Sequence, residues 1–341
     1  MSRRACILLS LFVGISSFLC AEYALRAFGV VNIYPSVATG YLGPAIKDAE
    51  LGWRNRPGAQ EYELRTDPSR TFRPTVAENS LRATSSADGS AARGNAELWF
   101  SGCSVTYGWM LEDQETFPWK VQKALPNTLV RNLGTAAYGT YQSMLFYQEL
   151  VKRSDPDTSL SPSVDVLHMF VPAHPDRNVN TFEWLRGQQI HNPFGWMEIP
   201  YCLLSDDGGL DCRPPEGLPW VPLAGRSTVF GLVGEVIQKQ RSRGREEVRF
   251  AVTKKLFSRF RDHVSAAGGR FHVGLLYPGD WNEELKKYLA EENISIIDCV
   301  MPQASTASRK IPNDGHPNSL MTSEWAECLV EKIKMLGDFR Q

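Results

Sequence analysis

From residue 97 onward, two hydrophobic patterns alternate along the chain and predict strands and helices in turn. Runs rich in apolar residues, which predict strands, lie at 98–100, 129–133, 164–171, 271–277 and 294–297; the run at 164–171 is typical of a strand covered on both faces. Between them, apolar residues three or four positions apart predict helices, most clearly at 248–264. Strands that alternate with helices through right-handed crossovers predict an α/β fold. We expect a doubly wound, flavodoxin-like parallel sheet of about five strands with helices on both faces.

Two segments do not follow this alternation. Residues 27–95 are poorly periodic and rich in Pro, Gly, Ser and Thr, which predicts an irregular N-terminal extension packed on the core. Residues 181–245 interrupt the α/β rhythm and predict an insertion draped over the carboxyl edge of the sheet. Its tryptophans either pack structurally or form a lid over a substrate; they are Trp184, Trp196 and Trp220. The α/β domain itself is expected to span 96–341.

The first 26 residues have the pattern of a signal anchor or a signal peptide. Arg3 and Arg4 precede an uncharged apolar run at 5–21, which ends at Glu22. Small residues suited to cleavage are poorly placed, so an uncleaved anchor is favoured over a cleaved signal. The arginine pair would keep the amino terminus in the cytoplasm and send the rest outside. We therefore expect a single-pass inner-membrane protein, with a secreted or periplasmic protein as the alternative.

Length and charge narrow the function classes. A chain of 341 residues can bury one sizeable core, and a formal net charge of −1 gives no reason to expect a nucleic-acid partner. The sequence contains no zinc-type Cys/His spacing and no glycine-rich nucleotide motif, so no metal or cofactor is expected. The oligomeric state is left open.

The chain has seven cysteines, and their count alone decides nothing. Cys202 and Cys212 flank a Gly/Asp-rich loop, so an exported domain could join them in a disulfide or leave them reduced. Cys103, Cys299 and Cys328 lie in apolar segments and are predicted to be packed thiols.

Two distant loops carry the candidate chemistry. The first strand ends at Gly102, which permits a sharp turn, and Ser104 follows at the carboxyl end of the predicted sheet. Asp314 and His316 share a loop near the other end of the chain. A serine hydroxyl needs a base, usually a histidine oriented by a carboxylate. We predict Ser104 as nucleophile, His316 as base and Asp314 as orienting carboxylate, with Asp298 as the alternative carboxylate.

This early serine and late Asp-x-His resemble the SGNH (GDSL-type) hydrolase superfamily over roughly residues 97–337. The stretch Asn79-Ser-Leu-Arg82 is similar to one ahead of the core in membrane-anchored bacterial members. The resemblance implies a serine esterase that removes an O-acyl group, acetyl above all, from an envelope or extracellular glycan. A glycan O-acyltransferase would use the same triad. A catalytically inactive glycan-binding or assembly protein is the non-enzyme alternative.

The resemblance also implies donors for the oxyanion, commonly the largest catalytic contribution. One is the backbone amide of Ser104. Another is a backbone amide in the block at 132–139, where Ala137 stands in place of the family's glycine and Gly139 follows two residues later.

The third family donor is an asparagine after the third strand, and here the chain departs from the family. Ala173 stands at that position, followed by His174, Arg177 and Asn178, which match a His-x-x-Arg-Asn pattern in an anchored subset. We hypothesise that His174 supplies the missing donor, with a structural, hydrogen-bonded histidine as the alternative. Arg177 and Asn178 are taken as supporting residues.

Overall fold

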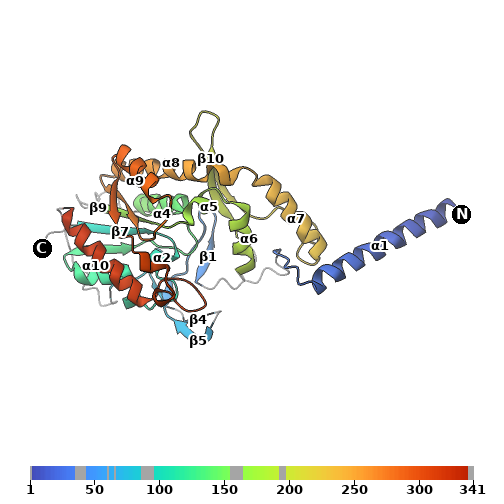
Figure 1. Ribbon diagram of the computed structural model, residues 1–341, viewed down its shortest axis with the longest axis horizontal. Coiled ribbons are helices and arrows are strands. Elements are labelled where there is room, and N and C mark those ends of the chain that lie inside the picture. The colour runs from blue at the N-terminus through green and yellow to red at the C-terminus, as the bar shows by residue number, and fades with distance from the viewer. Residues whose placement is uncertain are drawn as a thin grey trace.

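The central sheet has the predicted topology. The computed structural model describes residues 2–34, 44–59, 61–64, 67–85, 96–153, 164–191 and 197–336. Its five parallel strands run in the order β13-β12-β9-β7-β8 (Figure 1). They are β7 (Ala96–Gly102), β8 (Thr128–Asn132), β9 (Val164–Phe170), β12 (Arg270–Leu275) and β13 (Ser295–Asp298). The prediction of a flavodoxin-like α/β fold is confirmed.

Helices cover both faces of this sheet. One face carries α3 (Phe117–Ala124) and α10 (Ser319–Met335); the other carries α4 (Thr140–Arg153), α8 (Arg245–Ala266) and α9 (Asn282–Glu291). Successive side chains of a strand point to opposite faces. Phe100 therefore packs on Phe117 of α3, with 5.4 Å between ring centroids, while Trp99 packs on Tyr147 of α4.

The chain order places one strand end at a switch point. From β7 the chain passes to β8 on one side and then returns past β7 to β9 on the other. The carboxyl ends of strands at such a reversal are where open α/β sheets bind ligands. Short helices follow these ends: α2 (Ser104–Tyr107) after β7 and α5 (His174–Asn178) after β9. The 3₁₀ turns are η1 (Asp113–Glu115), η2 (Pro302–Ser305) and η3 (Ala307–Arg309).

The N-terminal extension forms small two-stranded pairs against the core. They are β1 (Ala45–Asp48) with β2 (Gly52–Asn55), β3 (Gly58–Ala59) with β6 (Thr75–Val76), and β4 (Tyr62–Leu64) with β5 (Asp67–Phe72). Leu51 and Trp53 are buried in the same cluster as the α4 residues. Among the described residues, α1 (Arg3–Ala27) is the one helix long and apolar enough to cross a membrane. It extends away from the domain in Figure 1.

The insertion contains regular elements. They are α6 (Phe182–His191), β10 (Ile199–Leu204), β11 (Leu210–Glu216) and α7 (Thr228–Arg241). Trp184 stacks on the Arg177 guanidinium at 4.4 Å, whereas Trp220 is 85% exposed and Trp196 lies outside the described residues.

Two disulfides are present in the described part of the chain. Cys202 and Cys212 face each other across the β10–β11 hairpin and are bonded. Cys299 and Cys328 are also bonded, so the prediction that they are packed thiols is wrong. Cys299 directly follows β13, and the fold packs it against Cys328 in α10. The two cysteines are 29 residues apart, so no local sequence pattern predicts their contact. Cys103 is a buried free thiol, as expected.

A buried ionic cluster joins β9 and β12 at the end of the sheet away from α2. Asp165 is fully buried, and its Oδ1 lies 2.5 Å from His272 Nε2. Arg270 donates to both carboxylate oxygens, at 2.9 and 2.6 Å. Burial raises the pKa of Asp165, but the hydrogen bonds from His272 and Arg270 outweigh it and hold that pKa below its usual value.

This cluster predicts a pH-dependent stability difference. Because the folded pKa of Asp165 is depressed, its contribution is present above the unfolded pKa of about 3.9 and is lost as pH falls through the folded pKa. Asp165→Asn should lower the free energy of unfolding by about 1–3 kcal/mol at neutral pH. Urea denaturation in detergent, repeated at falling pH, should show this difference shrinking below pH ~4. An equal difference at all pH values would contradict the assignment.

Candidate active site

The turn after β7 presents Ser104 at the switch point. Gly102 has φ +150°, and a Cβ there would lie 2.4 Å from Thr106 Oγ1 and 3.0 Å from the Met169 carbonyl. A residue with a side chain would collide with both neighbours, so glycine is required. Ser104 opens α2 directly afterwards and is 7% exposed.

The loop before α10 brings Asp314 onto His316. Asn313 and Gly315 adopt left-handed conformations, with φ of +61° and +90°. The amides of Asp314 and Gly315 both donate to the Ile311 carbonyl, which closes a tight turn. Asp314 Oδ1 then accepts from the His316 amide at 3.1 Å and lies 2.5 Å from His316 Nδ1. The turn explains how a carboxylate only two residues away can hold the ring.

The two loops meet. His316 Nε2 lies 2.9 Å from Ser104 Oγ, so hydroxyl, imidazole and carboxylate form one hydrogen-bonded chain. Asp298, the alternative carboxylate, instead forms an ion pair with Lys286 of α9 at 2.9 Å. The structure therefore places Asp314, and not Asp298, against the ring.

Trp109 also supports this chain, and its role was not predicted. Burial raises the pKa of Asp314. The hydrogen bond from the His316 ring, the charge of that ring, the His316 amide and, as the smallest contribution, the Trp109 side chain together bring that pKa below its usual value. The Trp109 and His316 rings are 6.2 Å apart. Trp109 lies near Ser104 in sequence, but no spacing rule links an indole to a carboxylate some 200 residues away.

The second block gives Ala137 a glycine-like backbone. Ala137 has φ +67°, in the left-handed region that favours glycine. The Trp53 indole donates to the Ala136 carbonyl at 2.9 Å, and Arg177 donates to the Tyr138 carbonyl at 2.9 Å. These bonds hold Ala137 from both sides in a conformation that alanine alone would not choose.

Gly139, the other candidate in this block, is engaged elsewhere. Its amide donates to Gln142 Oε1 at 3.3 Å, one turn into α4. Asn178 accepts from the Tyr141 amide at 3.1 Å and donates to Thr253 at 2.9 Å. Asn178 therefore fixes α5 against α4 and α8, and the amides of Ser104 and Ala137 stay the predicted backbone donors.

His174 is fully buried in α5. Its ring packs 5.2 Å from His168 and 5.4 Å from Phe170, and neither ring nitrogen has a partner among the residues the structure describes. Burial above all, with the charge of Arg177, holds its pKa well below the usual range, so the ring is neutral with one N–H. A buried, unpaired N–H costs about 1–3 kcal/mol. Both ring nitrogens are closed off from solvent, so a role as oxyanion donor requires this ring or its neighbours to move and stays a prediction.

His168 differs from His174 because both of its ring nitrogens have hydrogen-bond partners. Ser101 Oγ lies 3.0 Å from its Nδ1 and Thr140 Oγ1 lies 3.2 Å from its Nε2. Burial lowers the pKa of His168 to about 3. It is a neutral core histidine.

Arg82 holds the segment that follows Ser104. Its buried guanidinium donates to the carbonyls of Tyr107 (3.0 Å), Gly108 (2.7 Å) and Leu111 (2.6 Å). It also donates to Asp113 at 3.1 Å and stacks on the Tyr107 ring. In the sequence, the stretch ending at Arg82 stands out only by its resemblance to the family. The structure shows that Arg82 holds the turn that follows Ser104.

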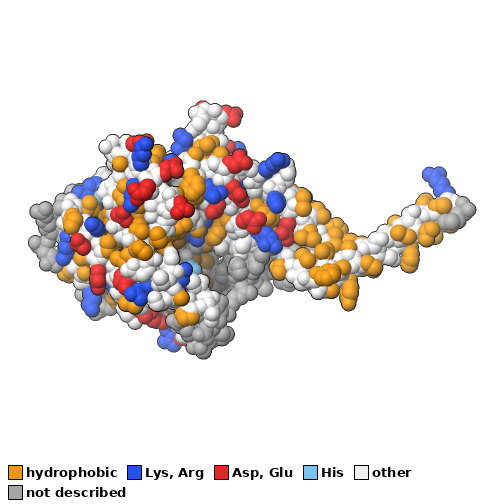
Figure 2. All heavy atoms as spheres, viewed as in Figure 1, with side chains coloured by type: hydrophobic (Ala, Val, Ile, Leu, Met, Phe, Trp, Pro, Cys, Tyr) orange, Lys and Arg blue, Asp and Glu red, His pale blue; other side chains and the backbone are white. Residues whose placement is uncertain are grey.

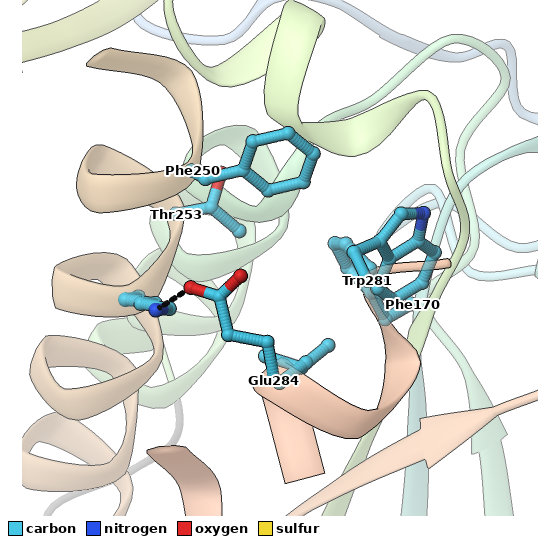
Figure 3. Close-up of a pocket in the computed structure, with 7 residues that line it drawn as sticks. Phe170, Phe250, Thr253, Trp281 and Glu284 are labelled. Carbon is cyan, nitrogen blue, oxygen red and sulfur yellow. Dashed lines mark hydrogen bonds and ion pairs between the residues drawn. The ribbon is translucent and has the colours of Figure 1, made fainter. Parts of the chain in front are cut away.

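A small hollow between α8 and α9 is separate from these residues (Figure 3). Lys254 and Glu284 form an ion pair at 2.5 Å beside it, and Trp281 packs edge-on against Phe170. None of Ser104, Asp314 and His316 lines it. The lining residues are Phe170, Phe250, Thr253, Lys254, Trp281, Glu284 and Leu285.

Comparisons with known proteins give similarities of fold. No protein-family model and no curated protein matches the chain. A lipolytic protein of the G-D-S-L family from Veillonella parvula is similar in structure, with 14% identity, a TM-score of 0.39, and coverage of 70% of this chain and 98% of that one. A carbohydrate esterase has 11% identity, a TM-score of 0.40 and coverage of 76% of each chain. An α/β hydrolase enzyme from the metagenome of Lake Arreo, Spain, has 9% identity, a TM-score of 0.38, and coverage of 73% and 100%.

Trp109 is predicted to be a positioning residue. Trp109→Phe keeps the ring beside His316 but removes the donor to Asp314, so the pKa of Asp314 should rise. If the triad hydrolyses esters, kcat should fall about tenfold and the acid limb of its pH profile should move upward. Trp99→Phe is the matched control, because its indole donates to Glu97 at 2.7 Å within β7. Equal pH profiles for both variants would show that Trp109 only packs.

Proposed function

We propose that this protein is an SGNH-type serine esterase that hydrolyses an O-acyl ester. The observation that carries the proposal is the continuous hydrogen-bonded chain from Ser104 Oγ through His316 to Asp314, at 2.9 and 2.5 Å. A hydroxyl, an imidazole and an ionised carboxylate in this order are the minimum set for serine acyl transfer. They lie at the switch point of an open α/β sheet.

In the proposed mechanism, Ser104 Oγ attacks the ester carbonyl while His316 Nε2 takes its proton. Asp314 holds the ring and stabilises the imidazolium. The oxyanion would accept from the amides of Ser104 and Ala137 and from His174. As the tetrahedral intermediate collapses, the bond from the acyl carbon to the leaving oxygen breaks, His316 gives that oxygen its proton, and the alcohol departs and leaves an acyl-enzyme. Water then attacks with His316 again as base, releasing the acid and restoring Ser104.

We also propose that α1 is an uncleaved signal anchor, with Arg3 and Arg4 in the cytoplasm and the α/β domain outside. Its length and hydropathy support this, as do the two disulfides, which suit an oxidising compartment. The end of α1 also contacts the domain, which favours retention over cleavage. An exported, anchored esterase of this kind points to acetyl groups on envelope or extracellular glycans as its substrate class.

Hydrolysis of p-nitrophenyl acetate by the full chain in detergent tests the triad. Ser104→Ala and His316→Gln should each lower kcat by about 10³-fold or more, because each removes a member of one acting unit. Ser308→Ala, an exposed serine near the His316 loop, is the control and should leave kcat unchanged. Undiminished turnover by Ser104→Ala would contradict the proposal. Acetate release from an acetylated glycan, with and without an unacetylated acceptor, separates hydrolysis from transfer.

His174→Phe tests the proposed donor. The change keeps an aromatic ring in the cluster and removes the N–H, so kcat should fall about 10²- to 10³-fold. Thermal unfolding should show no loss of stability, because an unpaired buried polar group is removed. An unchanged kcat would mean that His174 has only a structural role.

A further inference from the structure

Helix α7 presents its apolar side outward. Val233, Val236 and Ile237 are 46%, 69% and 37% exposed. The face turned to the domain is instead built of small and polar residues. They are Thr228, Gly231, Gly234, Glu235 and Gln238. A surface helix in water has the opposite arrangement, with its apolar stripe on the core.

The buried side of α7 is occupied by the segment that follows α1. Asn32 donates to the carbonyls of Ala224 and Ser227, at 2.6 and 3.3 Å. A Cβ on Gly231 would lie 2.2 Å from Asn32 Oδ1, and one on Gly234 would lie 2.0 Å from Tyr34 Oη. The glycines therefore admit this segment to close contact, and α7 cannot roll to bury its apolar side.

The end of α1 is joined directly to the start of α7. Glu22 accepts from the Thr228 and Val229 amides, at 2.9 and 3.1 Å, and from Ser227 Oγ at 2.8 Å. The first amides of a helix lack partners within it. Ser227 is the N-cap of α7 and accepts from the Phe230 amide at 3.3 Å, and the Glu22 carboxylate pairs the two amides before it. Arg26 adds a bond to the Arg226 carbonyl at 2.7 Å.

This joint fixes the depth of α7 relative to α1. Phe18 lies one turn before Glu22, about 6 Å deeper in the apolar run. Its ring is 5.5 Å from that of Phe230 in α7. If the apolar run of α1 spans a bilayer, Phe230 lies below the polar boundary. Figure 2 shows hydrophobic side chains continuing from α1 onto the domain at this end.

We infer that the outward face of α7 lies in the outer surface of the same bilayer that α1 crosses, as an interfacial amphipathic helix that seats the domain on lipid. The inference rests on the proposed anchor. Such helices bury apolar side chains at the headgroup boundary and place cations beside anionic lipid. Lys239 and Arg241 close α7, while Glu235, its acidic residue, is buried and paired with Arg186 at 3.1 Å.

Neighbouring side chains agree with a lipid occupant. Trp220 and Leu223, just before α7, are 85% and 60% exposed. An indole with an apolar body and a polar N–H is typical of the membrane interface. The function of this face would be to hold the Ser104 site at a set height and orientation above the membrane.

Depth-dependent quenching tests the inference in the full chain. Cys6→Ser and Cys20→Ser first remove the two exposed thiols. Three single-cysteine variants are then made on this background: Val236→Cys, Val13→Cys and Glu291→Cys. Each is labelled with an environment-sensitive dye and reconstituted in vesicles of phosphatidylethanolamine and phosphatidylglycerol. Position 13 reports on α1. Position 291 is the aqueous control, because the Glu291 side chain at the end of α9 is exposed. Dye at 236 and at 13 should be quenched by acyl-chain spin labels, and dye at 291 by aqueous iodide.

The outcomes separate the anchor from α7. Lipid quenching at 13 with iodide quenching at 236 would overturn the seating of α7 and leave the anchor intact. Lipid quenching at neither position would overturn both. Protection of 236 from iodide without quenching by lipid would mean that a second copy covers α7, which also overturns the inference. Lipid quenching at 236 alone would refute the anchor and, with it, the inference that α7 lies in the bilayer that α1 crosses.

Discussion

The hydrogen bond between Ser104 and His316 joins loops 212 residues apart, and the proposed chemistry depends on it. Its geometry is set by the sheet. Ser104 follows β7 at the switch point, and α10, which follows His316, packs on α3, the helix that leads from the same region into β8. Lys120 of α3 donates to the Ser319 carbonyl at 2.8 Å, which ties the start of α10 to that helix. The contact between Ser104 and His316 therefore depends on the packing of α3 and α10 against each other on one face of the sheet.

The N-terminal extension completes the site although it contributes no triad residue. Arg82 gathers the carbonyls after Ser104, and Trp53 holds the carbonyl before Ala137. Buried carbonyls without donors would be costly, so these bonds stabilise two turns whose backbones are otherwise unfavourable. The extension thus links the segment that follows α1 to the positions of Ser104, the proposed nucleophile, and Ala137, a predicted oxyanion donor.

The sequence was most informative where signals are local. Buried runs such as 164–171 predict central strands, and Asp314 lies close enough to His316 in sequence for their contact to be expected. Among long-range contacts, the meeting of Ser104 and His316 was expected from the base that a serine needs and from the family resemblance, but others left no such trace. The donors from Trp109 and Arg82 and the bond between Cys299 and Cys328 need the folded chain to become visible. The inverted face of α7 was hidden because its small residues are explained only by Asn32 and Tyr34, nearly 200 positions earlier.

Covalent labelling of the full chain tests the central claim most directly, because it reads the reactivity of one hydroxyl. A fluorophosphonate probe followed by peptide mass spectrometry should place a single adduct on Ser104, and His316→Gln should abolish it. Failure of the probe to label Ser104, or labelling that persists without His316, would show that the hydrogen-bonded chain does not activate this serine.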